Sequence, residues 1–376
     1  MQIYKNKSMC TGCTACSNIC PKEAISMRPD DKGFLYPEVN MSLCVQCGKC
    51  KTVCLTYEEN KRQNNDYAFY YINENTKTLL KSSSGGAFSK IAENVLIKGG
   101  CVCGAVFNHK WDVIHKVATN DSEVAEMRGS KYVQSDLQNV FREIEELLKC
   151  GKTVLFTGSP CQVVGLQKYL GKYYEKLILV DFICSSIPSP EIFRTYLKTL
   201  QNQYGEIKEI SFRDKSEGWK NYSVKIVCDQ KTYLKNHKED MFMKGFLGGL
   251  YSRSCCHNCP VKERLGYWSD ITIGDLWGAE EIFPQLDFYN GISVAISHTE
   301  RGLALIKEMQ CNKLELEEVY KHNPRYQCSH APYEELNKFW CIYKKKGLEK
   351  AYQFVYSPSL IKRVKEKIKR IIMRRE

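Results

Sequence analysis

The stretch Cys10-Thr-Gly-Cys13-Thr-Ala-Cys16-Ser-Asn-Ile-Cys20-Pro21 lies near the start of the chain, and Cys44-Val-Gln-Cys47-Gly-Lys-Cys50-Lys-Thr-Val-Cys54 repeats its cysteine spacing. This spacing is typical of bacterial ferredoxins that bind two [4Fe-4S] clusters, in which the fourth cysteine of each run ligates the other cluster. The spacing therefore predicts one cluster on Cys10, Cys13, Cys16 and Cys54, and a second on Cys44, Cys47, Cys50 and Cys20.

Two other interpretations of these eight cysteines are weaker. CxxC pairs also bind zinc, but a third cysteine after two residues and a fourth after three is not a zinc-finger spacing. A disulfide framework would indicate a secreted chain, and Met1–Met9 has no apolar core of a signal peptide. Leu55 stands where Pro21 follows the first run, a position that shapes the loop and supplies no ligand.

Composition limits the class of protein. The chain has 376 residues, 43% of them hydrophobic, but no run of 18 apolar residues that would predict a membrane span. Twenty cysteines without a signal peptide indicate a reducing, cytoplasmic environment and metal binding.

Positive charge is concentrated at the C-terminus. Residues 344–376 hold twelve Lys or Arg and three Glu, which is +9 of the net +12. The rest is nearly neutral, so we expect no nucleic-acid partner. Ile361, Val364, Ile368 and Ile371 recur on one face of an expected helix whose other face is basic. Such a helix suits peripheral contact with the inner membrane surface or an acidic partner, or it docks on its own domain.

The pattern divides the chain into a ferredoxin domain at 1–57, a polar linker at 58–66, a large domain at 67–340 and a basic helical tail at 341–376. Strands are predicted at 67–72, 101–107, 113–118, 153–157, 177–184, 207–212, 222–227, 271–273 and 292–296. Helices are predicted at 87–97, at 136–148, from 161 and at 190–200. This mixture indicates an α/β or α+β fold with a mixed sheet.

Three motifs lie where predicted strands end or helices begin. Ser82-Ser83-Ser84-Gly85-Gly86 precedes a helix and could bind an anion such as a flavin phosphate, although such runs are more often simple N-caps. Gly158-Ser159-Pro160-Cys161-Gln162 presents a cysteine at a helix start, as a nucleophile, a metal ligand or a packed thiol. Cys184 follows another apolar strand, at the sheet edge where open α/β sheets bind ligands.

A further pair, Cys256-x2-Cys259, is half of a metal site. Cys161 and Cys184 could complete a third four-thiolate cluster. Alternatively, Cys256 and Cys259 hold zinc with His257, or Cys161 and Cys184 are inert buried thiols. The remaining cysteines follow no ligand spacing and are interpreted as packing thiols: Cys101, Cys103, Cys150, Cys228, Cys311, Cys328 and Cys341.

Five motifs in order resemble the coenzyme F-420 hydrogenase/dehydrogenase β-subunit family, in its bacterial branch with a fused N-terminal ferredoxin. They are Ser84-Gly85-Gly86, Gly158-Ser159-Pro160-Cys161-Gln162, Phe212-Arg213-Asp214-Lys215 with Gly218-Trp219, Cys256-x2-Cys259, and Ser269-Asp270-Ile271-Thr272-Ile273-Gly274-Asp275-Leu276-Trp277-Gly278. The resemblance covers residues 1 to about 340.

The resemblance implies FAD, a third [4Fe-4S] cluster on Cys161, Cys184, Cys256 and Cys259, and hydride exchange with the deazaflavin coenzyme F-420. The flavin contacts that it implies are Ser84, Gly85, Gly86, Gly158 and Gln162, with Lys131 as a charge near the flavin or coenzyme. Ser185-Ser186 replace the family's His-Gly after Cys184, which affects the identity of the coenzyme more than cluster binding. Cys255 stands where serine is usual and is not expected to be a ligand.

The remaining motif residues carry weaker expectations. Asp270 and Asp275 could line the site, and Trp277 is more typical of a core. Asp214 and Lys215 are either an exposed ion pair on a turn or ligand contacts.

The expected function is that of an iron–sulfur flavoprotein oxidoreductase. It would pass electrons between coenzyme F-420, FAD and the clusters, with a redox partner protein or subunit at the ferredoxin face. One alternative is a flavin-dependent reductase of a small or carbohydrate-linked substrate, driven by the ferredoxin module. Another is a non-catalytic electron-relay subunit of a larger complex.

Overall fold

The computed structural model describes residues 1–356, in two compact units, one of residues 1–331 and one that begins at Pro332. Each unit is described by itself. The amphipathic basic helix expected within 357–376 lies outside the described residues.

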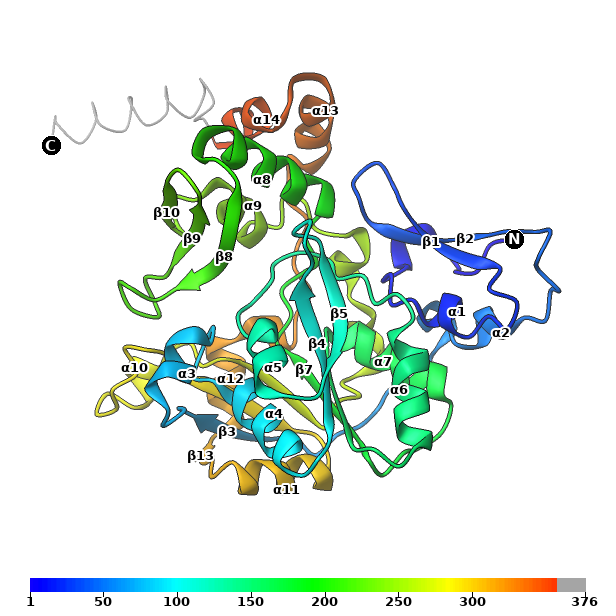
Figure 1. Cartoon of the computed structure of the whole chain (residues 1–376), viewed down its shortest axis with the longest axis horizontal. Helices are drawn as coiled ribbons and strands as arrows, with labels where there is room; N and C mark the ends of the chain where they lie inside the picture. Colours follow the sequence, from blue (N-terminus) through cyan, green and yellow to red (C-terminus); the bar gives the residue numbers. More distant parts are fainter. Residues whose placement is uncertain (357–376) are drawn as a thin grey trace, which may run out of the picture. The chain divides into compact units, whose positions relative to one another are not determined.

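The N-terminal module pairs a short hairpin with two cysteine loops (Figure 1). Strands β1 (Ile25–Pro29) and β2 (Leu35–Val39) are antiparallel. Each cysteine run ends in a one-turn helix, α1 (Ala15–Asn18) or α2 (Lys49–Thr52). The 3₁₀ turns η1 (Lys7–Met9) and η2 (Leu55–Tyr57) flank them. Cys16, Cys50, Ile3 and Ile25 form the small core of this module.

An eight-stranded mixed sheet forms the centre of the large domain, in the order β13-β3-β12-β11-β7-β6-β4-β5. Its strands are β3 (Tyr67–Tyr71), β4 (Cys101–Phe107), β5 (Val113–Ala118), β6 (Val154–Thr157), β7 (Leu177–Phe182), β11 (Ile271–Asp275), β12 (Ser293–Ser297) and β13 (Asn312–Leu314). The neighbours β4, β6, β7 and β11 are parallel, and antiparallel strands flank them. The mixed sheet agrees with the predicted fold class.

Helices cover both faces of this sheet (Figure 1). One face packs against α4 (Ala87–Ile97), α5 (Asp121–Met127) and α11 (Glu300–Glu308). The other packs against α6 (Val140–Lys149) and α7 (Pro160–Leu170). The short elements α3 (Thr76–Lys81), α10 (Ala279–Ile282), α12 (Leu316–His322), η5 (Pro324–Tyr326) and the π-helical turn η4 (Val261–Leu265) complete this layer arrangement.

A second, three-stranded antiparallel sheet is formed by β8 (Ile207–Asp214), β9 (Ser223–Cys228) and β10 (Thr232–Asn236). It is accompanied by α8 (Pro190–Tyr204) and α9 (Met241–Leu247), and the chain returns to the large sheet through the 3₁₀ turn η3 (Ser254–Asn258). The second unit contains α13 (Leu336–Lys346) and α14 (Leu348–Tyr356). No helix within residues 1–356 is long and apolar enough to cross a membrane.

Most predicted elements are present, with two informative differences. Residues 136–139, expected to begin a helix, are not helical: Asp136 forms a bridge to Ile114, and α6 begins at Val140. Strand β7 ends at Phe182, so Cys184 lies on the loop beyond it.

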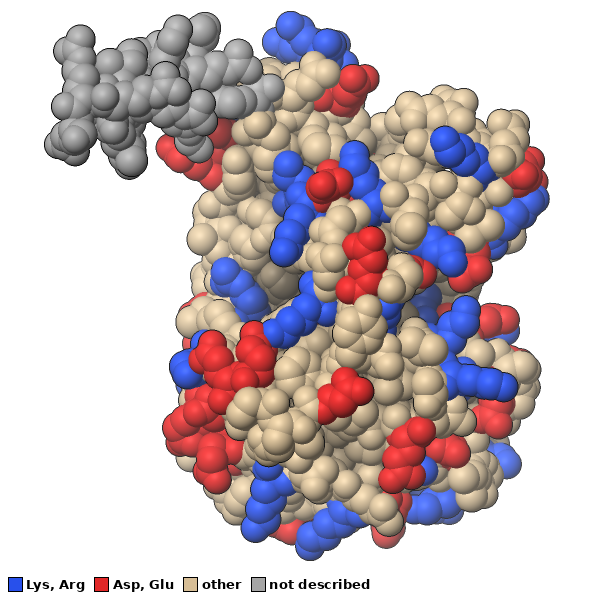
Figure 2. Space-filling view, turned by 90° about the vertical axis from the view of Figure 1, so that its left-hand side faces the viewer, with Lys and Arg blue, Asp and Glu red and all other residues tan. Residues whose placement is uncertain are grey.

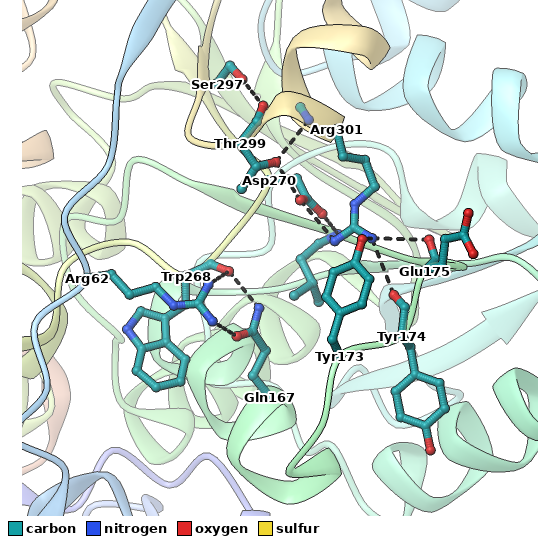
Figure 3. Close-up of polar contacts among 12 residues, drawn as sticks. Arg62, Gln167, Tyr173, Tyr174, Glu175, Trp268, Asp270, Ser297, Thr299 and Arg301 are labelled. Atoms are coloured by element: carbon teal, nitrogen blue, oxygen red, sulfur yellow. Dashed lines mark hydrogen bonds and ion pairs between the residues drawn. The ribbon is translucent and has the colours of Figure 1, made fainter.

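The segment 58–66 has no regular structure but is tied to the large domain. Glu58 pairs with Lys168 at 2.5 Å, and Arg62 donates to the Gln167 side chain at 2.7 Å. Figure 3 shows Arg62 stacked on Trp268, with 4.4 Å between guanidinium and ring centroid. This segment is therefore anchored to the large domain at Glu58 and Arg62, although most of its side chains are exposed.

Candidate functional site

Two hollows lie within the ferredoxin module, and each is lined by four cysteines. One is lined by Cys10, Cys13, Cys16 and Cys54. The other is lined by Cys20, Cys44, Cys47 and Cys50. These are the two sets that the spacing predicts, including the exchange of the fourth cysteine. We call them the inner and outer ferredoxin sites; their occupation by clusters stays a prediction.

Backbone geometry shapes both cysteine loops in the same way. The residues directly before and directly after the second cysteine of each run have positive φ: Gly12 (71°) and Thr14 (60°) in the first run, Gln46 (53°) and Gly48 (78°) in the second. Thr14 and Gly48 are the N-caps of α1 and α2. The two runs therefore have one backbone form, although glycine occupies different positions in them.

Hydrogen-bond donors face the cysteine sulfurs, as a thiolate-ligated cluster requires. The Ala24 N–H donates to Cys20 Sγ at 3.3 Å, and Cys54 Sγ lies 3.2 Å from the Thr56 hydroxyl. Burial raises the pKa of Cys13 to about 12, although the Ala15 N–H lowers it. Donors to sulfur stabilise ligated thiolates and tune cluster potentials, so the two hollows fit the groups that the spacing predicts.

A third group of cysteines lies inside the large domain. Cys161 is at the start of α7, directly after β6, and Cys184 follows β7, at the carboxyl edge of the parallel strands. Cys256 lies in η3 and Cys259 caps it. Burial raises the pKa of Cys161 well above its usual value, and the neighbouring Cys255, Cys259 and Cys184 raise it further. The structure thus places Cys161, Cys184, Cys259 and Cys255 within electrostatic range of one another, and Cys256 lies beside Cys255 and Cys184. That four of these thiols hold a cluster stays a prediction.

Donors also surround this interior cysteine group. The Ile187 N–H donates to Cys256 Sγ at 3.3 Å, and the Ser159 hydroxyl lies 3.3 Å from Cys161 Sγ. The Lys262 ammonium donates to the carbonyl of Cys184 at 2.6 Å. The group therefore also fits a thiolate-bound cluster.

Helix α7 joins the interior group to the inner ferredoxin site. Gly165 follows Cys161 by one helical turn, and a Cβ at Gly165 would lie 2.8 Å from Cβ and 3.1 Å from Sγ of Cys13. Leu55, which replaces the proline after the second run, is 2% exposed and packs in the same core cluster as Cys161. Both residues hold the module closely against the large domain.

Arg253 makes a second connection between the same two sites. It precedes η3, and its fully buried guanidinium reaches the ferredoxin module. Nε donates to the Cys10 carbonyl at 2.7 Å, Nη2 donates to the Leu35 carbonyl at 2.9 Å, and Nη2 lies 3.6 Å from Cys10 Sγ. Sequence reasoning missed Arg253 and Gly165. A glycine inside a helix costs about 1 kcal/mol relative to alanine, so Gly165 carried a signal.

The residues expected at the flavin have contacts within the protein. Ser84 Oγ donates to the Ile292 carbonyl at 2.6 Å. A Cβ at Gly85 would lie 2.2 Å from the Tyr71 carbonyl oxygen, and Gly86 has φ 84° as the N-cap of α4. No side chain caps α4, so its first N–H groups can face an anion. The fit to a flavin phosphate rests on these backbone groups.

Lys131 is half-buried near this helix start. Its ammonium donates to the carbonyls of Met127, Arg128 and Gly129 at 3.2 Å each, which caps the end of α5. Burial lowers the pKa of Lys131 to about 7. The Ser130 N–H donates to Ser83 Oγ at 2.6 Å, so the Lys131 loop lies beside the serine run.

Gly158 and Gln162 shape the start of α7. The Ser159 N–H donates to Gln162 Oε1 at 2.9 Å as part of a capping box, and Gln162 Nε2 donates to Ser135 Oγ at 2.8 Å. A Cβ at Gly158 would lie 3.0 Å from Gln162 Oε1. These contacts position Cys161.

The two motif aspartates form ion pairs. Asp275 pairs with Arg213 through two 3.0 Å contacts and accepts from Trp219 Nε1 at 2.8 Å. Asp270 pairs with Arg301 at 3.0 Å and accepts from the Thr299 hydroxyl at 2.7 Å (Figure 3).

Other motif residues differ in part from expectation. Trp277 stacks on Trp219 with 4.9 Å between ring centroids. Asp214 lies 3.8 Å from Lys225 instead of pairing with Lys215, which is buried and donates to the Ser84 carbonyl at 2.7 Å. Cys101, Cys103 and Cys228 are buried as packing thiols, whereas Cys150, Cys328 and Cys341 are exposed, so that interpretation was wrong for these three.

A buried polar chain, not foreseen from the sequence, leads from Asp181 to the tied segment. Asp181 contacts the Thr272 hydroxyl, which lies 2.7 Å from His298 Nε2, and His298 Nδ1 lies 2.7 Å from Asp66. The Thr272 hydroxyl donates to Asp181 Oδ1, which leaves its oxygen able to accept from His298 Nε2. Burial raises the pKa of Asp181 to about 7, although His298 and the hydrogen bond from Thr272 lower it.

Surface charge is mixed on the face drawn in Figure 2. Asp and Glu side chains gather at the lower left of this view, and Lys and Arg side chains are scattered over the rest without a continuous basic area. This agrees with the nearly neutral balance of the chain outside its basic tail.

Comparisons with known proteins cover most of the chain. Residues 151–322 match the C-terminal model, and residues 70–142 the N-terminal model, of the coenzyme F420 hydrogenase/dehydrogenase beta subunit. Residues 9–57 match a 4Fe-4S dicluster domain. A search of curated proteins found no match.

Among solved structures, a chain from the F420-reducing [NiFe] hydrogenase complex of Methanosarcina barkeri is similar at 16% identity with a TM-score of 0.47, over 81% of this chain and 94% of that one. The family rests on the two beta-subunit models, which together span most of the large domain. The chain belongs to the coenzyme F-420 hydrogenase/dehydrogenase beta-subunit family and carries a 4Fe-4S dicluster domain at its N-terminal end.

Proposed function

We propose that this protein is an iron–sulfur flavoprotein oxidoreductase that passes electrons between a hydride-carrying coenzyme of the F-420 type and a redox partner. The observation that carries the proposal is that the three cysteine groups adjoin one another in a row. The interior group adjoins the inner ferredoxin site through α7 and Arg253, and the inner and outer sites share one module.

In this proposal Cys161, Cys184, Cys256 and Cys259 hold a third [4Fe-4S] cluster, and the two ferredoxin sites hold one each. The chain's own part is to keep these groups close and dry. Cys161 and Cys256 are buried, as are Leu55 and Val164 of the core beside them. Exclusion of water lowers the reorganisation that accompanies electron transfer and strengthens local electrostatics.

The proposal places FAD at the uncapped start of α4. Backbone N–H groups from Gly86 onward would face its phosphates, with Ser84 and Lys131 nearby. A bound flavin exchanges hydride with a coenzyme and single electrons with clusters. Gly158 and Gln162 would act there by positioning the turn before α7.

A redox partner is proposed to dock over the outer ferredoxin site. Four apolar side chains near its cysteines are exposed: Met1, Met41, Leu43 and Val45, the last at 59%. Met1 and Val45 also line the hollow of that site. Exposed apolar groups beside a redox centre suit a protein interface. A cytoplasmic location, with reversible membrane contact through residues 357–376, belongs to the same proposal.

A second function is favoured by one departure from the family pattern. Ser185-Ser186 follow Cys184 where the family has His-Gly, and Ser186 is buried with its hydroxyl accepting from Ser252 at 2.8 Å. A different hydride donor or a small or carbohydrate-linked substrate would fit this change. A relay subunit without its own flavin is the remaining alternative.

The test is an anaerobic absorbance titration of the purified full chain with reduced coenzyme F-420, with dithionite as the positive control. We expect one flavin per chain and stoichiometric bleaching of flavin and cluster bands. Bleaching by dithionite alone would overturn F-420 as the donor and favour the second function. Absence of flavin from a chain with intact clusters would favour the relay.

A further inference from the structure

Arg253 is a buried cation whose partners include no carboxylate. Its hydrogen bonds go to the carbonyls of Cys10 and Leu35, to the Gln134 side-chain oxygen at 3.2 Å, and to Cys10 Sγ. Among the described residues, no carboxylate forms an ion pair with it at 4.0 Å or less. A buried charge needs compensation, and among these hydrogen-bond partners the Cys10 sulfur is the one that can carry a full negative charge.

Its guanidinium is held in one orientation. The group lies 4.2 Å from the Tyr36 ring centroid and 5.5 Å from that of Phe34, both in the ferredoxin hairpin. A Cβ at Gly12 would lie 3.1 Å from Nη1, so the first cysteine loop closes directly on the guanidinium. The side chain is therefore preorganised against the inner ferredoxin site.

The backbone of Arg253 belongs to the interior cysteine group. Its N–H donates to the Ile187 carbonyl at 2.8 Å, and its carbonyl accepts from the Cys256 N–H at 2.9 Å. Cys255 and Cys256 are among the groups that raise the pKa of Arg253, so both cysteine groups lie within its electrostatic range. One residue thus spans the two groups, with its backbone in one and its charge at the other.

We propose that Arg253 is a positioning residue that raises the reduction potential of the inner ferredoxin cluster and fixes that cluster beside the interior group. This inference rests on the proposed function, because it assumes that the inner site holds a cluster. A cluster with four thiolates is anionic, and reduction adds one electron and one more negative charge. A fixed cation at Cys10 therefore favours the reduced state, and a hydrogen bond to a ligand sulfur acts in the same direction.

The outer site has only a more exposed counterpart: Arg142 donates to the Cys20 carbonyl at 2.9 Å but pairs with Glu23 at the surface. Lys22 and Lys49 line its hollow and are exposed, and solvent and salt screen such charges. Arg253 should therefore give the inner cluster the higher reduction potential of the ferredoxin pair. An electron that passes between the interior group and the outer site would then be most stable on the inner cluster.

The test is an anaerobic redox titration of the full chain, followed by electron paramagnetic resonance, for the natural protein, Arg253→Gln and Arg253→Lys. Arg142→Gln is the matched control, because Arg142 also crosses from the large domain to a ferredoxin cysteine carbonyl, that of Cys20 at 2.9 Å, but pairs with Glu23 at the surface. The interior cluster is identified by its loss in Cys256→Ser.

Arg253→Gln should lower the potential of one ferredoxin component by at least a tenfold change in its one-electron equilibrium constant, about 59 mV. Arg253→Lys keeps the charge but not the forked donors, and should give a smaller shift. Arg142→Gln should leave the reduction potential of that component unchanged. If Arg253→Gln fails to bind clusters, the ferredoxin potentials of Arg253→Lys are used as the test.

Unchanged ferredoxin potentials in loaded Arg253→Gln, or in loaded Arg253→Lys where Arg253→Gln does not load, would overturn the inference, as would an equal shift in Arg142→Gln. A natural protein without two ferredoxin signals would instead overturn the proposed function.

Discussion

The inner and outer ferredoxin sites share one cysteine spacing and one loop form but differ in what surrounds them. At the inner site, Gly12 is closed in: a Cβ there would lie 2.5 Å from Gln134 Nε2. The outer run has the exposed Gln46 at the equivalent position, and Gly48 has nothing within 4 Å of a Cβ. The repeated motif fixes the metal-binding loop, and the packing against the large domain distinguishes the two sites.

This difference indicates separate roles. A buried site with a fixed cation is suited to hold an electron inside the protein, whereas an exposed site beside apolar side chains is suited to exchange it with a partner. Four experiments test or refine the comparison, in order of expected effect.

The largest effect is expected from Cys256→Ser. It should remove about one of three clusters, roughly a third of the iron, and spare both ferredoxin sites. The neighbouring Cys255→Ser is the control and should keep all of the iron. Iron and sulfide analysis measures the outcome; equal iron in both variants would mean that the interior group holds no cluster through Cys256.

Chelator should remove iron from the outer site first. Cys47 is exposed, whereas Cys16 is buried and Cys13 lies under α7. We expect loss from the two ferredoxin sites to differ by about tenfold in rate, since opening of the inner site requires local unfolding. Anaerobic incubation with chelator, followed over time by electron paramagnetic resonance spectra, measures the two rates of loss. Simultaneous loss would contradict the distinction between the sites.

Asp181→Asn should change the pH dependence of stability while sparing the iron. The folded-state pKa of Asp181 is raised to about 7, so its contribution is fully present below the unfolded value near 3.8 and is lost as pH rises through 7. The loss is at most roughly 4 kcal/mol. The groups that face it are His298 and Asp66 along the polar chain, with Cys184 and Tyr267 nearby.

Anaerobic denaturant unfolding between pH 4 and 8 provides the measurement, with Asp287→Asn, at an exposed aspartate outside the polar chain, as the control. The stability of Asp181→Asn should vary less with pH than that of the natural protein. An unchanged slope would mean that Asp181 is ionised in the fold throughout.

The smallest effect is expected from Gly165→Ala. Its Cβ would press on Cys13, and overpacking of this kind costs about 1–3 kcal/mol. The inner site should then lose iron to chelator at a rate closer to that of the outer site. Gly48→Ala has open space and serves as the control, with only its positive φ to strain it. If the inner site of Gly165→Ala still lost iron to chelator slowly, α7 would not be what protects that site.

Much of this arrangement could be predicted from the sequence where the signal was local. Cysteine spacing predicted the grouping at both ferredoxin sites, and residues 101–107 and 113–118 are β4 and β5 with the predicted limits. The predicted start of a helix at Asp136 failed because its backbone instead bonds to Val113 and His115 beside β5, at 2.9 and 3.0 Å. An amphipathic pattern cannot reveal such a partner.

The contacts that distinguish the two sites could not be predicted in this way. Arg253 and Cys10 are separated by 243 positions in sequence, and Asp181 and Thr272 by 91. Strand β10 was also missed because it alternates exposed and partly exposed residues without a buried apolar face.

The tied segment 58–66 has a consequence for the electron transfer that we propose. Carrier domains on loose tethers swing between donor and acceptor, and their turnover slows as solvent viscosity rises. Here Glu58 and Arg62 bind α7, while Asp66 accepts from Tyr326 at 2.5 Å. The ferredoxin module is thus fixed rather than carried on a loose tether. Under the proposed function, the partner would have to come to the module, and internal transfer should be insensitive to viscosity.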